Sequence, residues 1–151
     1  MARVYVVYDT KHGNTKLVAE KIAEGMREVK GIEVEVSDAK DVNLEKMADS
    51  DAILIGAPNH IGSPSRAIVK FIDRLGKLEL KAKGFAAFDT YLARDFEKAV
   101  KKMEKKIDEK LPNLKLLAPG LSVRVVGMTG PVAEGEFTKC LDFGKKIAAQ
   151  L

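Results

Sequence analysis

The chain begins with Arg3-Val-Tyr-Val-Val-Tyr-Asp-Thr-Lys-His-Gly-Asn-Thr15, and this stretch decides how the remaining sequence is interpreted. Residues 4–8 are β-branched or aromatic without interruption, which is typical of a strand buried on both faces of a parallel sheet. Turn-forming residues follow, and a helical period begins at Thr15 with an apolar stripe of Val18, Ile22, Met26 and Val29. A strand, a tight loop and a helix in this order aim free backbone N–H groups and a helix dipole at an anion. The stretch therefore predicts a phosphate-binding loop.

Two common kinds of phosphate loop are excluded by what this stretch lacks. It contains no Gly-Lys-Ser/Thr, so the lysine and the metal-binding hydroxyl of a P-loop are missing. It contains no G-x-G-x-x-G, so the dinucleotide fingerprint is missing as well. An ordinary turn, in which Asn14 and Thr15 only cap the helix, is the alternative interpretation.

The segment Thr10-Lys11-His12-Gly13-Asn14-Thr15 resembles the phosphate loop of the flavodoxin family, which typically reads Thr/Ser-x-Thr-Gly-Asn-Thr. The longer segment from Tyr8 most resembles the flavodoxin domain of diiron flavoproteins that reduce oxygen or nitric oxide. The resemblance implies bound FMN, with its phosphate held by the hydroxyls of Thr10 and Thr15 and by the N–H groups of residues 11–15. His12 replaces the hydroxyl residue that the family usually has two positions after Thr10.

Length and composition predict one domain over residues 1–151 with a substantial core. The longest apolar stretches, 52–58 and 84–88, are too short to cross a bilayer, and no signal peptide is visible, so we expect no membrane association and a cytoplasmic location. Cys140 is the only cysteine and shares a helical face with apolar residues, which favours a buried, unreactive side chain. One cysteine and two histidines predict no disulfide and no metal site.

The net charge of +4 and the pI of about 9.1 are compatible with an acidic partner. Much of the excess lies in a lysine-rich helix expected near 96–111, whose apolar stripe is Phe96, Val100, Met103, Ile107 and Leu111. Acidic residues alternate with these lysines, so a solvated helix face is the simpler interpretation, and we expect no nucleic-acid partner.

Strands and helices alternate along the whole chain, which predicts an α/β protein with helices on both faces of a parallel sheet. Further strands are expected at 32–36, 52–56 and 84–88, and the last one in two pieces, 114–117 and 121–126, that Pro119-Gly120 separates. Five strands and five helices fit a flavodoxin-like three-layer sandwich with strand order 2-1-3-4-5. The order itself is the standard example for flavodoxin, with FMN at the switch point between strands 1 and 3.

This fold would bring three loops, 9–15, 57–63 and 89–95, to the carboxyl edge of the sheet. The resemblance implies that Tyr91 stacks on the outer face of the flavin ring, while His60 and Ile61 contact the inner face. The expected cofactor-binding residues outside the first loop are Pro58, Asn59, His60, Ile61, Gly62, Thr90, Tyr91 and Leu92.

The resemblance implies an FMN-binding electron carrier between redox protein partners, which we expect to be a monomer or weak dimer. Such a carrier needs no catalytic acid, base or nucleophile, and the sequence offers no constellation of that kind. Two alternatives stay open: an FMN-dependent NAD(P)H:quinone-type reductase, and a flavin-free interaction module on the same fold.

Overall fold

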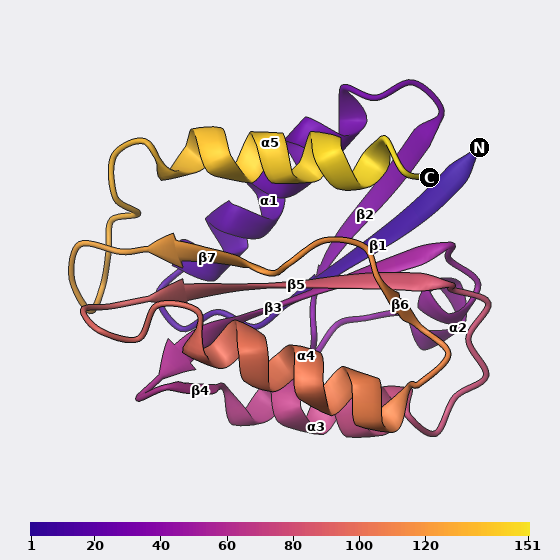
Figure 1. Cartoon of the computed structure of the whole chain (residues 1–151), viewed down its shortest axis with the longest axis horizontal. Coiled ribbons are helices and arrows are strands. Elements are labelled where there is room, and N and C mark those ends of the chain that lie inside the picture. Colours follow the sequence, from indigo (N-terminus) through magenta and orange to yellow (C-terminus); the bar gives the residue numbers. More distant parts are fainter.

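The computed structural model describes residues 1–151 as one twisted sheet between two layers of helices (Figure 1). The central parallel strands are β1 (Ala2–Tyr8), β2 (Ile32–Asp38), β3 (Ala52–His60) and β5 (Gly84–Tyr91). Two short strands, β6 (Lys115–Leu116) and β7 (Leu121–Arg124), both pair in parallel with β5. The order is β2-β1-β3-β5 followed by β6 and β7, so the predicted order and the divided last strand are confirmed.

The helices are α1 (Asn14–Arg27), α2 (Leu44–Ala48), α3 (Arg66–Leu75), α4 (Lys98–Lys110) and α5 (Glu136–Ala148). Helices α1 and α5 cover one face of the sheet, and α3 and α4 cover the other (Figure 1). Each face has its own buried apolar cluster of similar size, which is why the central strands contain few polar residues. Strand β2 alternates partly buried and exposed residues instead, as expected for the strand at the sheet edge.

Two glycines let α1 and α5 approach each other closely. A Cβ atom on Gly144 would meet the backbone oxygen of Ile22, and one on Gly25 would meet the backbone oxygen of Leu141. Cys140 is fully buried on the same side of the sheet, as predicted, and burial raises its pKa to about 12. Its thiol is therefore protonated and unreactive at neutral pH.

One prediction about the lysine-rich helix is wrong. Phe96 was expected to begin its apolar stripe, but α4 begins at Lys98 and the Phe96 side chain is 55% exposed. The physical reason is that the chain turns at Glu97, whose φ of 61° is left-handed, so helical phase is not continuous across this residue. The other buried members, Val100, Met103 and Ile107, are as predicted.

No helix of the structure is long and apolar enough to cross a membrane.

Candidate functional site

The predicted phosphate loop connects the carboxyl end of β1 to the first turn of α1. Gly13 precedes the helix with a φ of 88°, a left-handed conformation that a glycine adopts without strain. Its N–H donates to Thr10 Oγ1 over 3.0 Å, which closes the loop into a compact turn. The Thr10 hydroxyl hydrogen is not used in this bond and stays available to a ligand.

The N-terminus of α1 is left without internal partners. No side chain caps the helix, and the N–H groups of His12, Asn14, Thr15 and Lys16 donate to no protein acceptor. The alternative interpretation, in which Asn14 and Thr15 are capping residues, therefore does not describe this loop. Several adjacent unpaired N–H groups at the positive end of a helix dipole form a binding site for an anion such as a phosphate group.

Thr15 connects the phosphate loop to the neighbouring part of the site. Its Oγ1 lies 2.8 Å from Thr90 Oγ1, and both residues are buried. Because one hydroxyl donates and the other accepts, Thr15 is free to donate to a phosphate when Thr90 supplies the shared hydrogen. Asn14 packs against Gly130, where a Cβ atom would collide with its amide group. The loop after β7 is thus in direct contact with the predicted phosphate loop.

The second predicted loop is in fact a β-hairpin. Strand β3 continues through Pro58, Asn59 and His60, and pairs antiparallel with β4 (Ser63–Pro64). Ile61 and Gly62 alone form the turn, with φ of 52° and 81°. Two consecutive positive φ values are what a tight hairpin of this length requires, but a β-branched residue such as Ile61 adopts them only with strain.

The side chain of Asn59 ties this hairpin to the third loop. Its Oδ1 accepts the N–H of Gly62 over 2.8 Å, and its Nδ2 donates to the carbonyl of Asp95 over 2.8 Å. One amide group therefore fixes both walls of the site relative to each other. Sequence reasoning placed Asn59 in the site but did not find this connection, because it depends on a residue 36 positions away.

The third predicted loop is also partly strand, since β5 includes Thr90 and Tyr91. Tyr91 packs edge-to-face against Phe96, with ring centroids 5.3 Å apart and planes at 70°. The exposed Phe96 ring thus supports the side chain that was expected to stack on a flavin.

A buried carboxylate holds the end of this loop. Asp89 has no exposed surface, and it accepts hydrogen bonds from the N–H of Val100 and the hydroxyl of Ser122. The Ser122 hydroxyl oxygen in turn accepts the N–H of Glu97 over 2.9 Å. Desolvation by burial outweighs these hydrogen bonds and raises the pKa of Asp89 to about 6.

These segments enclose a cavity of about 500 Å³ at the carboxyl edge of the sheet, within the ~300–1,000 Å³ range of small-molecule sites. Twelve of the fourteen predicted residues line it. The two others are Gly13 and Gly62, which shape the backbone without facing the cavity. The lining also includes Ala93, Asp95, Val125 and Met128.

The last two of these residues belong to a fourth segment that the sequence prediction of three loops did not include. The N–H of Val125 donates to the carbonyl of Tyr91 over 2.9 Å, which draws the chain after β7 to the cavity. The predicted strand order could have indicated that this segment belongs to the site. A fifth parallel strand delivers its carboxyl end to the same edge as the others.

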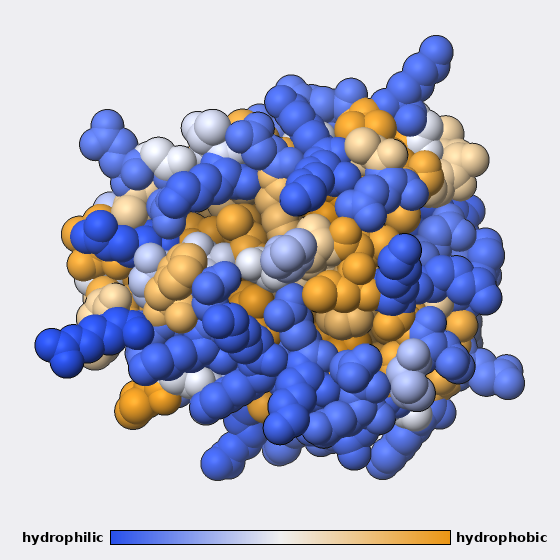
Figure 2. Space-filling view, viewed as in Figure 1, coloured by the Kyte–Doolittle hydropathy of each residue, from blue (hydrophilic) through white to orange (hydrophobic).

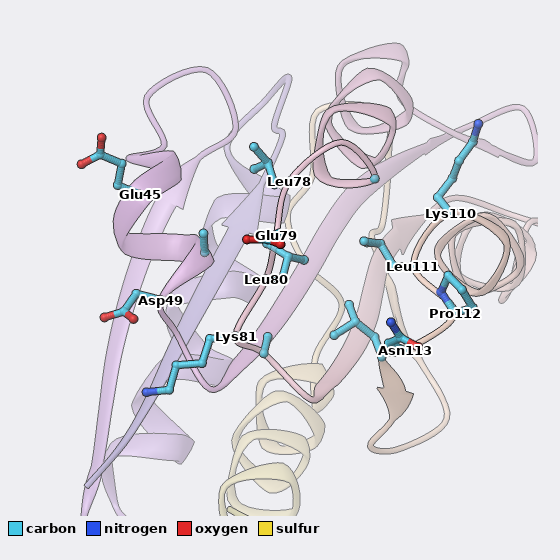
Figure 3. A pocket seen from close by; sticks show the side chains of 14 residues that line it. Glu45, Asp49, Leu78, Glu79, Leu80, Lys81, Lys110, Leu111, Pro112 and Asn113 are labelled. Atoms are coloured by element: carbon cyan, nitrogen blue, oxygen red, sulfur yellow. The ribbon is translucent and has the colours of Figure 1, made fainter.

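A larger cavity, about 810 Å³, lies at the opposite edge, between α2, the segment 76–82 and residues 110–114 (Figure 3). Leucines form part of its wall, and charged residues of both signs also line it: Glu45, Asp49, Glu79, Lys81 and Lys110 (Figure 3). Helix α2 begins beside it, but this helix has only five residues and is capped by Asn43, whose Oδ1 accepts the N–H of Lys46 over 3.1 Å, so the cavity does not face an uncapped helix as the other edge does. Size alone therefore does not identify the site.

Comparison with known proteins gives the class of protein. A sequence profile of the flavodoxin domain matches residues 5–129, and the chain belongs to the flavodoxin family. Members of this family bind FMN and transfer electrons.

Particular relatives agree with this assignment. A flavodoxin of Aquifex aeolicus is 37% identical over 93 residues, which cover 60% of this chain and 50% of the relative. An NAD(P)H dehydrogenase (quinone) of Caulobacter vibrioides is 32% identical over 98 residues, covering 52% of this chain and 49% of the relative. The matched part thus spans about half the length of these relatives.

Solved structures match the whole chain. A flavodoxin from the domain Archaea is 27% identical with a TM-score of 0.84, and the match covers 98% of this chain and 97% of that one. The flavodiiron core of Flv1 from Synechocystis shares the fold, with 19% identity, a TM-score of 0.78 and coverage of 99% of this chain and 36% of that one. The predicted flavodoxin-like fold is confirmed.

Proposed function

We propose that the cavity at the carboxyl edge holds FMN and that the protein transfers electrons between redox protein partners. The observation that carries the proposal is the row of unpaired N–H groups at the start of α1, next to a cavity with an apolar wall. The phosphate would lie against Thr10, Asn14 and Thr15, and the ring between the hairpin and Tyr91. When bound, FMN supplies one- and two-electron redox chemistry, and the protein determines its orientation and accessibility.

The residues present are suited to this group. The donors are neutral hydroxyl and N–H groups, which bind a phosphate monoester without a metal ion. Residues Pro58, Ile61, Tyr91 and Leu92 offer the flat or apolar surfaces that an isoalloxazine needs, and all four line the cavity. Lys11 and His12 also line it and add donors at the phosphate end.

A titration that compares FMN with riboflavin tests the proposal. Riboflavin lacks the phosphate, so it should bind more weakly by at least ~1.5–3 kcal/mol for each charge-assisted hydrogen bond lost. Quenching of flavin fluorescence measures both dissociation constants. Equal affinities would contradict the assignment of the phosphate loop, and no binding of either flavin would contradict the proposed cofactor and leave the flavin-free module.

The C. vibrioides relative favours one second candidate, a quinone reductase that uses NAD(P)H. The two functions differ in whether NADPH reduces the bound flavin directly. An electron carrier keeps its oxidised flavin spectrum when NADPH is added, whereas a reductase loses the yellow absorbance and then consumes a benzoquinone. The cytoplasmic location and the monomeric or weakly dimeric state stay predictions, the latter testable by light scattering.

A further inference from the structure

Exposed apolar side chains gather around the mouth of the cavity. Ile61, Leu92 and Met128 line it while remaining 97%, 37% and 77% exposed. Phe96 extends this surface through its contact with Tyr91. These four residues, here called the apolar rim, make up a large part of the nine exposed large hydrophobic side chains of the protein.

Apolar atoms are visible among extended hydrophilic side chains at the left margin of Figure 2, where the carboxyl ends of the strands lie. Exposed apolar side chains gathered at one place on the surface mark an interaction site.

Positive charge surrounds the apolar rim. Lys11 lines the cavity, Arg66 follows the hairpin, Arg94 lies between two lining residues, and the Nζ of Lys102 donates to Ser63 in β4. No carboxylate lies within 4.0 Å of any of these four cations, as the ion pairs of the structure involve other residues.

The acidic residues of the segments 9–15, 57–66 and 89–102 offset only part of this charge. Asp95 pairs with Lys98 over 3.2 Å, and Glu97 pairs with Lys101 over 3.8 Å. Asp9 and the buried Asp89 are the carboxylates of these segments that have no cationic partner, and together they offset two of the four cations. The loop after β7 adds no net charge, because Arg124 and Glu134 carry opposite signs and Glu136 pairs with Lys139. The rim is therefore apolar at its centre and cationic at its periphery.

We propose that the apolar rim is the docking surface for an acidic redox protein, whose own redox centre lies near a surface surrounded by carboxylates. The proposal rests on the proposed electron-transfer function and adds the chemical class of the partner. Transient electron-transfer interfaces are small, below ~1,200 Å², and an apolar centre of four side chains suits that size. The peripheral cations speed the association and orient the partner, while the brief contact between apolar surfaces allows rapid release.

Helix α4 is not a second docking surface of the same kind, although it is rich in lysine. Lys106 and Lys110 both lie beside Asp73, at 2.9 and 3.8 Å, and Lys98 and Lys101 are paired as described. Its charge is thus largely compensated within the protein, in agreement with the simpler interpretation of its sequence.

The experiment uses the FMN-loaded, ¹⁵N-labelled protein and two probes of similar size: an acidic ferredoxin and the basic cytochrome c. FMN loading is verified first from the absorbance spectrum. The ferredoxin should shift the amide resonances of residues 61–66, 92–98 and 126–129. Its affinity should fall by ~10-fold or more between 50 and 300 mM salt, because screening shortens the range of the charges. Cytochrome c should bind more weakly at either salt concentration.

A pair of double variants separates local charge from net charge. Arg66→Gln/Arg94→Gln removes two cations beside the rim, and Lys77→Gln/Lys115→Gln removes two exposed cations elsewhere, neither of which forms an ion pair. The first should weaken ferredoxin binding roughly 3- to 10-fold, and the second less than about two-fold. FMN affinity should not change in either variant, since none of the four residues lines the cavity.

Three results would overturn the docking proposal while FMN stays bound: tighter binding of cytochrome c than of ferredoxin, equal losses in both double variants, or amide shifts confined to other surfaces. The proposed function would survive each of them. A protein that fails to bind FMN would overturn both proposals together.

Discussion

Replacing Asn59 by alanine should loosen both walls of the flavin site at once. The substitution removes two hydrogen bonds of 2.8 Å, one to the Gly62 N–H and one to the Asp95 carbonyl. Each is partly buried and is worth ~0.5–1.5 kcal/mol net, so we expect Asn59→Ala to lower the free energy of unfolding by about 1–3 kcal/mol. The free protein would then spend part of its time with the hairpin and the third loop apart. Since only the closed arrangement binds the ring, FMN affinity should fall in proportion to the closed fraction, by up to about 5- to 30-fold when ~1–2 kcal/mol of the loss acts on this closure.

Urea unfolding of the flavin-free protein and fluorescence titration with FMN measure the two effects separately. Asn59→Asp keeps the acceptor for the Gly62 N–H but loses the donor to the Asp95 carbonyl. Its FMN affinity therefore shows how much of the effect comes from the contact with the third loop alone. Asn113→Ala is a matched control, because this exposed asparagine lies in the cavity at the opposite edge. An Asn59→Ala protein with unchanged FMN affinity would refute the idea that this amide pre-organises the site.

Three further predictions concern stability. The pKa of Asp89 is raised from its ordinary 3.8 to about 6, so the folded protein binds the extra proton between these values. The stabilisation by the protonated form is complete below about pH 4 and is lost as the pH rises through 6. Relative to Asp89→Asn, the wild-type protein should therefore gain up to ~3 kcal/mol when the pH is lowered from 7 to 4 in urea titrations, and a constant difference would contradict this. Ile61→Asn should raise the thermal midpoint, with a gain of about 1 kcal/mol in the free energy of unfolding. Asparagine tolerates the left-handed φ, and the isoleucine side chain is 97% exposed, so its removal costs little buried apolar surface. Gly62→Ala should lower the midpoint, because alanine does not tolerate the positive φ of that position. Gly144→Ala should destabilise the protein by ~1–3 kcal/mol or more, since the new methyl group meets the backbone of α1, and an unchanged urea midpoint would show that the two helices can separate without cost.

The order of elements could be predicted because it depends on local properties of the chain. Uninterrupted apolar runs such as 4–8 and 52–56 mark strands covered on both faces, and the alternation in β2 marks an edge. Because connections between parallel strands are right-handed and do not cross one another, only a few topologies are then possible. The phosphate loop is equally local, since a glycine with positive φ followed by an uncapped helix is encoded within six residues.

The boundaries of the site were less predictable. Pro58 to His60 were expected in a loop, yet β3 extends through them, because Pro58 pairs with Thr90 of β5 and the next two residues pair with β4. The exposure of Phe96 follows from the left-handed turn at Glu97, which interrupts the helical period on which its predicted burial depended. Sequence periodicity carries no information about such breaks.

The sequence by itself determined the fold class and the turn between β1 and α1, because these depend on neighbours a few positions apart. The lining residues of the later loops were predicted from the family resemblance and the strand order, and the structure places them at one cavity. Tertiary structure alone decided which side chains connect the walls. Asn59 reaches Asp95, Thr15 reaches Thr90, and Val125 bonds to Tyr91 across 34 to 75 positions of sequence. Hydrogen bonds of that kind form only after the sheet has brought the carboxyl ends of its strands together, so no local pattern encodes them.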